Sequence, residues 1–225
     1  MKKKEERSIL SASIMCADIL HIQEVLDELE ASQIDYIHCD IMDNHYVNNL
    51  MLPMYQINRF HEATTLPFDI HIMAEDPESI IDKLNLNRDD FVYVHYECTK
   101  DIHGLSVKLR AQGVKIGVAL SPFTPIENIM GILCDVDAIL LMMVVPGFSG
   151  QPLLPNSIDR IRQTRKMLKE MMLEHILIEV DGSCSFERIQ DMHKAGADAF
   201  VLGSSSLFDN NQSISEGVAK LRSLL

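Results

Sequence analysis

Histidines and aspartates alternate with apolar residues in two short segments of this sequence. The first segment is His38-Cys39-Asp40-Ile41-Met42-Asp43, and the second is Asp69-Ile70-His71-Ile72-Met73. A third segment ends in Glu179-Val180-Asp181-Gly182. Because alternate side chains of an extended chain point to the same face, the histidines and carboxylates of each segment are expected to emerge together.

These side chains predict a site for one divalent metal ion. Charged groups that point into a packed interior cost several kcal/mol each unless a partner offsets them. Two imidazoles and two carboxylates suit Zn²⁺ first, with Fe²⁺, Mn²⁺ or Co²⁺ as alternatives, and they do not suit Ca²⁺. The competing interpretation is that each is a separate polar residue of a surface loop, satisfied by its own hydrogen bonds. The candidate ligands are the histidines and acidic residues of the three segments.

Small residues are concentrated in three other segments. These are Pro146-Gly147-Phe148-Ser149-Gly150-Gln151-Pro152, Gly182-Ser183 and Gly203-Ser204-Ser205-Ser206. Small side chains let backbone N–H groups approach an anion, and helix N-termini add partial positive charge. Glycine-rich segments are also common in ordinary turns, but three of them at one end of a sheet favour a phosphate site.

The chemistry must be positioned by alternating strands and helices. Apolar runs rich in β-branched residues alternate with segments of helical periodicity, which indicates a parallel sheet. Eight such units favour a single-domain (β/α)8 TIM barrel over residues 1–225, with the site at the carboxyl ends of the strands. An open doubly wound sheet is the alternative, but no Gly-x-Gly-x-x-Gly follows the first strand. The expected strands are residues 8–13, 36–41, 68–72, 91–95, 115–120, 138–144, 175–180 and 199–203.

Two residue types sharpen the expected chemistry. Of the 13 methionines, Met42, Met73 and Met142 are expected beside the metal, whereas most of the others fill the core. No lysine falls near the carboxyl end of an expected strand, which disfavours a Schiff-base aldolase. Ser185 is expected to cap a helix that ends near Gly196.

Composition restricts the partners. The 225 residues include 20 Lys and Arg against 33 Asp and Glu, a net charge of −13. A field this acidic argues against nucleic acid and against anionic membranes as partners. No apolar run is long enough to cross a bilayer, and the charged N-terminal residues do not resemble a signal peptide. The five scattered cysteines are expected to be reduced thiols of a cytoplasmic protein.

Together the quoted segments resemble the ribulose-phosphate 3-epimerase family, in the same order and spacing over residues 9–207. Some details resemble its D-allulose-6-phosphate 3-epimerase branch: Met15-Cys16, Gly182-Ser183-Cys184 and Ser205-Ser206-Leu207-Phe208. The resemblance implies that His38, Asp40, His71 and Asp181 bind the metal, and that Asp40 and Asp181 are also the acid/base pair. It also implies a homo-oligomer that acts on a phosphorylated ketose.

The resemblance assigns further residues to substrate. Ser13 and His71 would contact the substrate, and the three methionines named above would form an apolar wall around its reacting carbons. The phosphate would be bound by Gly147, Phe148, Ser149, Gly150, Gly182, Ser183, Gly203 and Ser204.

Four positions depart from the family pattern. Ala12 replaces a proline, Asn44 a glycine, Asn48 a proline and Ser149 a glycine. No proposed ligand or base is lost, and Asn44 can adopt the left-handed conformation that a glycine supplies.

The expected reaction is epimerisation at C3 of a ketose phosphate through an enediolate, with one carboxylate removing a proton and the other returning one to the opposite face. The substrate would be D-ribulose 5-phosphate, giving D-xylulose 5-phosphate, or D-allulose 6-phosphate, giving D-fructose 6-phosphate. The alternatives are a metal-dependent aldolase on the same barrel and a sugar-phosphate-binding protein without turnover.

Overall fold

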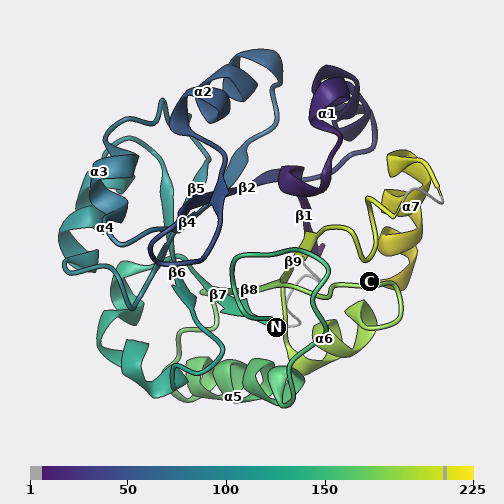
Figure 1. Ribbon diagram of the computed structural model, residues 1–225. Helices are drawn as coiled ribbons and strands as arrows, with labels where there is room; N and C mark the ends of the chain where they lie inside the picture. The colour runs from purple at the N-terminus through teal and green to yellow at the C-terminus, as the bar shows by residue number, and fades with distance from the viewer. Residues whose placement is uncertain (1–6, 210–211) are drawn as a thin grey trace.

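Eight parallel strands close into a barrel in the computed structural model, which describes residues 7–209 and 212–225 (Figure 1). The barrel closes where β1 pairs with β2, with Ser13 opposite His38. The predicted TIM barrel is therefore confirmed, and each predicted strand agrees with an observed one to within a few residues. The strands are β1 (Ile9–Ser13), β2 (Tyr36–Asp43), β4 (Phe68–Met73), β5 (Phe91–His95), β6 (Lys115–Leu120), β7 (Ala138–Met142), β8 (Leu177–Asp181) and β9 (Ala199–Leu202).

Helices surround the ring of strands, one after each of them (Figure 1). The crossover from β6 to β7 is a 3-10 helix, η3 (Ile126–Asp135), where an α-helix was predicted. Its buried Ile126 and Ile129 are three residues apart, which suits three residues per turn. The α-helices are α1 (Ile22–Ala31), α2 (Met54–Ala63), α3 (Pro77–Ile81), α4 (Ile102–Arg110), α5 (Ser157–Glu170), α6 (Ile189–Ala195) and α7 (Ile214–Leu224), and two short 3-10 turns, η1 (Ile14–Cys16) and η2 (Ile19–His21), follow β1.

The start of α6 corrects one prediction. Ser185 does not cap this helix, because its hydroxyl donates to Glu187 within a turn and the helix begins only at Ile189. The predicted end is confirmed, since Gly196 follows the helix with φ of 116°.

Alternating side chains build two layers of core. The outward-facing residues of the strands, such as Ile37 and Ile139, pack against the helices and are completely buried. The inward-facing residues of the lower barrel include an apolar cluster that contains Tyr93 and Leu140. Gly117 makes room for the Tyr93 ring, since a Cβ at this position would lie 2.1 Å from Tyr93 Cε1.

A short hairpin extends β2 beyond the barrel and was not predicted. β3 (Leu50–Met51) pairs antiparallel with the end of β2, with Met42 opposite Met51. Asn44 begins the connecting turn with φ of 60°, the left-handed conformation expected for it. This hairpin holds the segment after β2 over the carboxyl end of the barrel.

Within the described residues, no helix combines the length and the apolar character needed to cross a bilayer. The five cysteines are free thiols. The expected domain boundaries, residues 1–225, stay a prediction, and residues 1–6 and 210–211 lie outside the described part of the chain.

Candidate active site

The strand register brings the four expected metal ligands together. Asp40 on β2 lies opposite His71 on β4, and Asp181 ends β8. Asp40 Oδ1 is 3.3 Å from both His38 Nε2 and His71 Nδ1, and Asp181 Oδ2 is 3.7 Å from His71 Nδ1. One donor atom from each residue lies within 4.8 Å of all the others.

These donor atoms fit a small divalent cation. Ligands about 2.0–2.1 Å from a tetrahedral ion lie roughly 3.3–3.4 Å from one another, which matches the contacts made by Asp40. His71 Nδ1 is completely buried, faces the cluster and has no hydrogen-bond partner. A bare imidazole nitrogen beside two carboxylates is the donor that Zn²⁺, Fe²⁺, Mn²⁺ or Co²⁺ would accept.

The two carboxylates of the cluster have pKa values that diverge. Burial and the charge of Asp40 raise the pKa of Asp181 to about 6. Burial also opposes ionisation of Asp40, but the charge of His38 and its hydrogen bond outweigh it and hold the pKa of Asp40 below its usual range. Ser13 Oγ donates to Asp40 Oδ2 at 3.1 Å and also favours the ionised form. Two carboxyl groups whose pKa values differ in this way are suited to different proton-transfer roles.

A second polar layer lies deeper in the barrel. Asp69 Oδ2 is 2.8 Å from His38 Nδ1 and accepts from Ser11 Oγ at 3.0 Å. Glu179 interacts with the other side of Asp69, and burial and the charge of Asp69 raise the pKa of Glu179 well above its ordinary value. His38, Asp69 and Glu179 are also close enough together to hold an ion.

A third polar group backs His71, and sequence reasoning missed it. His95 Nε2 is 2.9 Å from His71 Nε2, and His95 Nδ1 is 2.8 Å from Tyr46 Oη and 3.3 Å from Glu97 Oε2. Burial lowers the pKa of His95 to about 4, so this ring is neutral. Burial would raise the pKa of Glu97, but hydrogen bonds from His95 and Thr124 outweigh it and lower it to about 2. His95 ends an expected strand, so the rule that selected His38 and His71 could have identified it.

A cavity of about 550 Å³ opens above the cluster at the carboxyl ends of the strands. Most of the residues expected to contact substrate line it, together with Asp40 and Asp181. His38 and His71 do not, because both are completely buried beneath its floor. The expected residues that line the cavity are Ser13, Met42, Met73, Met142, Gly147, Phe148, Ser149, Gly150, Gly182, Ser183, Gly203 and Ser204.

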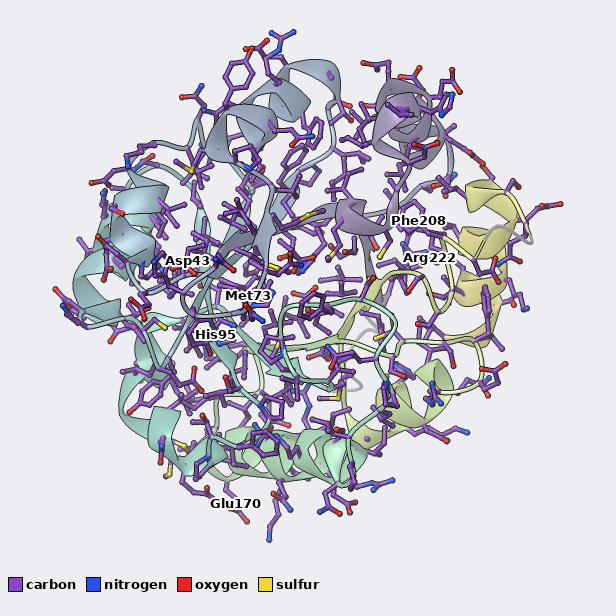
Figure 2. The ribbon with its side chains drawn as sticks, in the orientation of Figure 1. Asp43, Met73, His95, Glu170, Phe208 and Arg222 are labelled. Carbon is purple, nitrogen blue, oxygen red and sulfur yellow. The ribbon has the colours of Figure 1, made fainter. Side chains whose placement is uncertain are left out.

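Three methionines line this cavity from different strands, Met42 on β2, Met73 on β4 and Met142 on β7. Met42 and Met73 pack together with Val47, and both are almost completely buried. In Figure 2, Met73 and His95 lie inside the ring of strands, whereas Glu170 lies outside it on α5. The three methionines therefore line the cavity, and their role as a wall around the reacting carbons stays a prediction.

The glycine- and serine-rich segments that follow β7, β8 and β9 also line the cavity. Gly182 has φ of 106°, and a Cβ there would lie 2.6 Å from Val144 Cγ2, so no larger residue fits without a shift. Asn49 Nδ2 donates to Gly147 O at 2.7 Å and ties the hairpin to the 146–151 segment. No lysine or arginine is among the described residues that line the cavity. An anion there would be bound by backbone N–H groups and hydroxyls.

The four departures from the family pattern fall in different places. Ala12 is completely buried and faces the helices, away from the cavity. Asn44 and Asn48 are exposed, and neither lines the cavity. Ser149 does line it. Cys16, a residue that was quoted for the branch resemblance but given no role, lines it as well.

Comparisons with known proteins agree with this architecture. The sequence model described as "Ribulose-phosphate 3 epimerase family" matches residues 9–208. The chain is 34% identical to ribulose-phosphate 3-epimerase of Bacillus subtilis over 92% of this chain and 96% of the relative. It is 36% identical to the enzyme of that name from Chlamydia pneumoniae, over 90% and 89% of the two chains.

Solved structures show the same fold at low identity. N-(5'-phosphoribosyl)anthranilate isomerase from Pyrococcus furiosus superposes with a TM-score of 0.64 at 11% identity, over 97% of this chain and 98% of that one. Orotidine 5'-phosphate decarboxylase from Pyrococcus horikoshii gives 0.64 at 14% identity, over 96% and 97%. These similarities support the barrel and carry no further argument.

Proposed function

Because the chain belongs to the ribulose-phosphate 3-epimerase family, we propose that it inverts C3 of a phosphorylated ketose by proton transfer between two carboxylates. The observation that carries this proposal is the placement of Asp40 and Asp181. They come from β2 and β8, which are separated in the barrel by β1 and β9, and both line one cavity. A sugar carbon held between them would present one face to each carboxylate.

The pKa difference between the carboxylates supports this assignment. Asp40 is ionised at neutral pH and can accept the C3 proton. Without a cation, burial and the charge of Asp40 raise the pKa of Asp181 to about 6, so this is the carboxyl group of the two that holds a proton more readily. Each carboxylate would act as base in one direction of the reaction and as acid in the other.

Removing a proton from C3 places negative charge on the substrate oxygens, which water alone stabilises poorly. A divalent cation bound by His38, Asp40, His71 and Asp181 would supply Lewis-acid stabilisation of that charge. Met42, Met73 and Met142 would keep water away from the enediolate. Backbone N–H groups of the glycine-rich segments would bind the phosphate and fix the distance between it and C3.

The family name favours the pentulose D-ribulose 5-phosphate. D-Allulose 6-phosphate is the second candidate, because several residues that resemble the allulose branch line the cavity: Met15, Cys16, Ser183 and Ser205. The homo-oligomeric state and the cytoplasmic location expected from the resemblance stay predictions.

Product analysis by ¹³C and ³¹P NMR tests the proposed function. The purified protein with added Zn²⁺, Fe²⁺, Mn²⁺ or Co²⁺ is incubated with each ketose phosphate in parallel. We expect at least one substrate to give its C3 epimer without a change in mass. Two smaller products would support the aldolase alternative, and saturable binding without conversion of either substrate would support the non-catalytic alternative.

A further inference from the structure

The two histidines of the proposed metal site are each backed by a hydrogen-bond chain that ends in a carboxylate. The chains differ in length. His38 contacts Asp69 directly, whereas His71 reaches Glu97 only through His95. Neither Asp69, His95 nor Glu97 lines the cavity above the cluster.

The short chain fixes which nitrogen of His38 is free. Asp69 Oδ2 is 2.8 Å from His38 Nδ1 and already accepts from Ser11 Oγ, so Nδ1 carries a proton and donates it. The other nitrogen, Nε2, faces Asp40 and the cluster. His38 would therefore offer Nε2 to a cation.

The long chain fixes which ring nitrogen of His71 carries the proton, because each hydrogen bond of the chain needs one donor and one acceptor. His95 Nδ1 faces the Tyr46 hydroxyl at 2.8 Å and the Glu97 carboxylate at 3.3 Å, and a carboxylate only accepts hydrogen bonds. The Tyr46 hydroxyl can donate instead to Ser121 Oγ, 2.7 Å away. His95 Nδ1 therefore carries the proton, and His95 Nε2 is left as an acceptor.

The acceptor role of His95 Nε2 determines which nitrogen of His71 is protonated. With two ring nitrogens 2.9 Å apart and His95 Nε2 accepting, His71 Nε2 must donate. A neutral imidazole carries one ring proton, and in His71 that proton lies on Nε2. His71 Nδ1 therefore has a free lone pair, which faces Asp40 and Asp181. This agrees with the absence of any hydrogen-bond partner for that buried atom.

The opposite arrangement is disfavoured by the same contacts. If His95 donated through Nε2, its bare Nδ1 would face the lone pairs of the Glu97 carboxylate. The proton of His71 would then lie on Nδ1, where it would block a cation. Glu97 is held in place by the backbone N–H of Ser121, which donates to Glu97 Oε1 at 3.1 Å, and by the Thr124 hydroxyl.

We propose that Asp69 and the His95–Glu97 pair are positioning residues that fix His38 and His71 in opposite tautomers, so that the cation is bound by Nε2 of one and Nδ1 of the other. The proposal rests on the metal site of the proposed function. It goes further because it assigns a role to Asp69, His95 and Glu97, which would contact neither the substrate nor the ion. Hydrogen-bond partners of metal-binding histidines affect metal affinity by about 10- to 100-fold.

Co²⁺ binding provides a test that does not depend on turnover. The affinity of the metal-free protein is measured by competition with a chelating indicator, and the coordination is followed by the visible absorption of Co²⁺. His95→Phe keeps the ring volume but removes the acceptor for His71, and we expect it to weaken Co²⁺ binding by about 10- to 100-fold. His95→Gln retains a carbonyl oxygen that can accept, and it should recover much of the loss.

His61→Phe is the matched control, because His61 is a buried histidine of α2 that stacks on Phe68 outside the cluster. It should bind Co²⁺ as the wild type does. Glu97→Gln should weaken binding less than His95→Phe, since Tyr46 can still accept from His95. Nitrogen-15 NMR of histidine-labelled protein should show His38 protonated on Nδ1 and His71 on Nε2 in the metal-bound form.

The outcomes separate this proposal from the proposed function. If the wild type binds Co²⁺ but His95→Phe binds it equally tightly with the same spectrum, the positioning role is wrong while the metal site stands. The positioning role is also wrong if His71 is protonated on Nδ1. If the wild type binds no Co²⁺ at micromolar concentration, the metal site itself is wrong and this proposal is lost with it.

Discussion

Asp181→Asn should stabilise the metal-free protein at alkaline pH, although it removes a proposed catalytic group. The pKa of Asp181 is raised from an ordinary value of 3.8 to about 6 by burial and by the charge of Asp40. The side chain is 17% exposed, so little of this effect is lost to solvent. Each pKa unit is worth about 1.4 kcal/mol, and the ionised carboxylate therefore costs the fold about 3 kcal/mol above pH 6.

The sign follows from linkage. The fold holds the proton of Asp181 more tightly than the unfolded chain does, so stability from this group is present below about pH 4 and is lost as pH rises through 6. Asparagine has nearly the same shape and cannot ionise. The gain in the free energy of unfolding should be about 3 kcal/mol at pH 8, roughly half of that at pH 5 and less than about 1 kcal/mol at pH 4.

Urea unfolding with a chelator and a thiol reductant measures these differences. At pH 8 the gain corresponds to an increase in Tm of roughly 6–12 °C for a chain of this size. Asp191→Asn, at an exposed position of α6, is the control and should change stability by less than about 0.5 kcal/mol. Added Zn²⁺ should reverse the order, because the cation stabilises the wild type more strongly. A gain that is absent at pH 8, or that is the same at pH 4 and pH 8, would refute the reasoning.

Three further predictions concern the turns at Gly182 and Asn44 and the metal site. Gly182→Ala should lower the free energy of unfolding by about 2–4 kcal/mol and raise KM, because its Cβ would meet Val144 at a positive φ; urea unfolding and initial rates measure both, and unchanged values would contradict the close approach. Asn44→Ala should cost about 1–2 kcal/mol, whereas Asn44→Gly should be nearly neutral, because φ is 60°; equal effects in urea unfolding would contradict this account. Dialysis against a chelator should abolish turnover and added divalent metal should restore it; full activity of a chelated sample verified as metal-free would contradict the metal site.

Much of the fold could be predicted because the barrel obeys a local rule. Each strand is a short run of apolar residues, and the chemistry lies at its carboxyl end. Spacing therefore placed the candidate ligands at one end of the barrel, whereas the choice of His38, Asp40, His71 and Asp181 among them came from the family resemblance. η3 and the β2–β3 hairpin were not predicted, since each depends on how a loop packs against the barrel.

Hydrogen-bond partners that lie on different strands could not be predicted in the same way. Asp69 shares a face with His71, but only the register shows that it lies one layer deeper, against His38 and Glu179. His95 could have been selected as a residue at a strand end, yet its role depends on the position of Glu97 and Tyr46. A sequence shows which groups are present, whereas the direction of each hydrogen bond requires the neighbours on both sides.

Deuterium exchange tests the central claim most directly. The metal-loaded protein is incubated with D-ribulose 5-phosphate and, separately, with D-allulose 6-phosphate in D₂O, and each carbon is examined by NMR and mass spectrometry. Two-base proton transfer predicts one deuterium at C3 of the epimerised product and none at the other carbons. An epimer formed without deuterium at C3, or no exchange with either substrate, would contradict the assignment of Asp40 and Asp181.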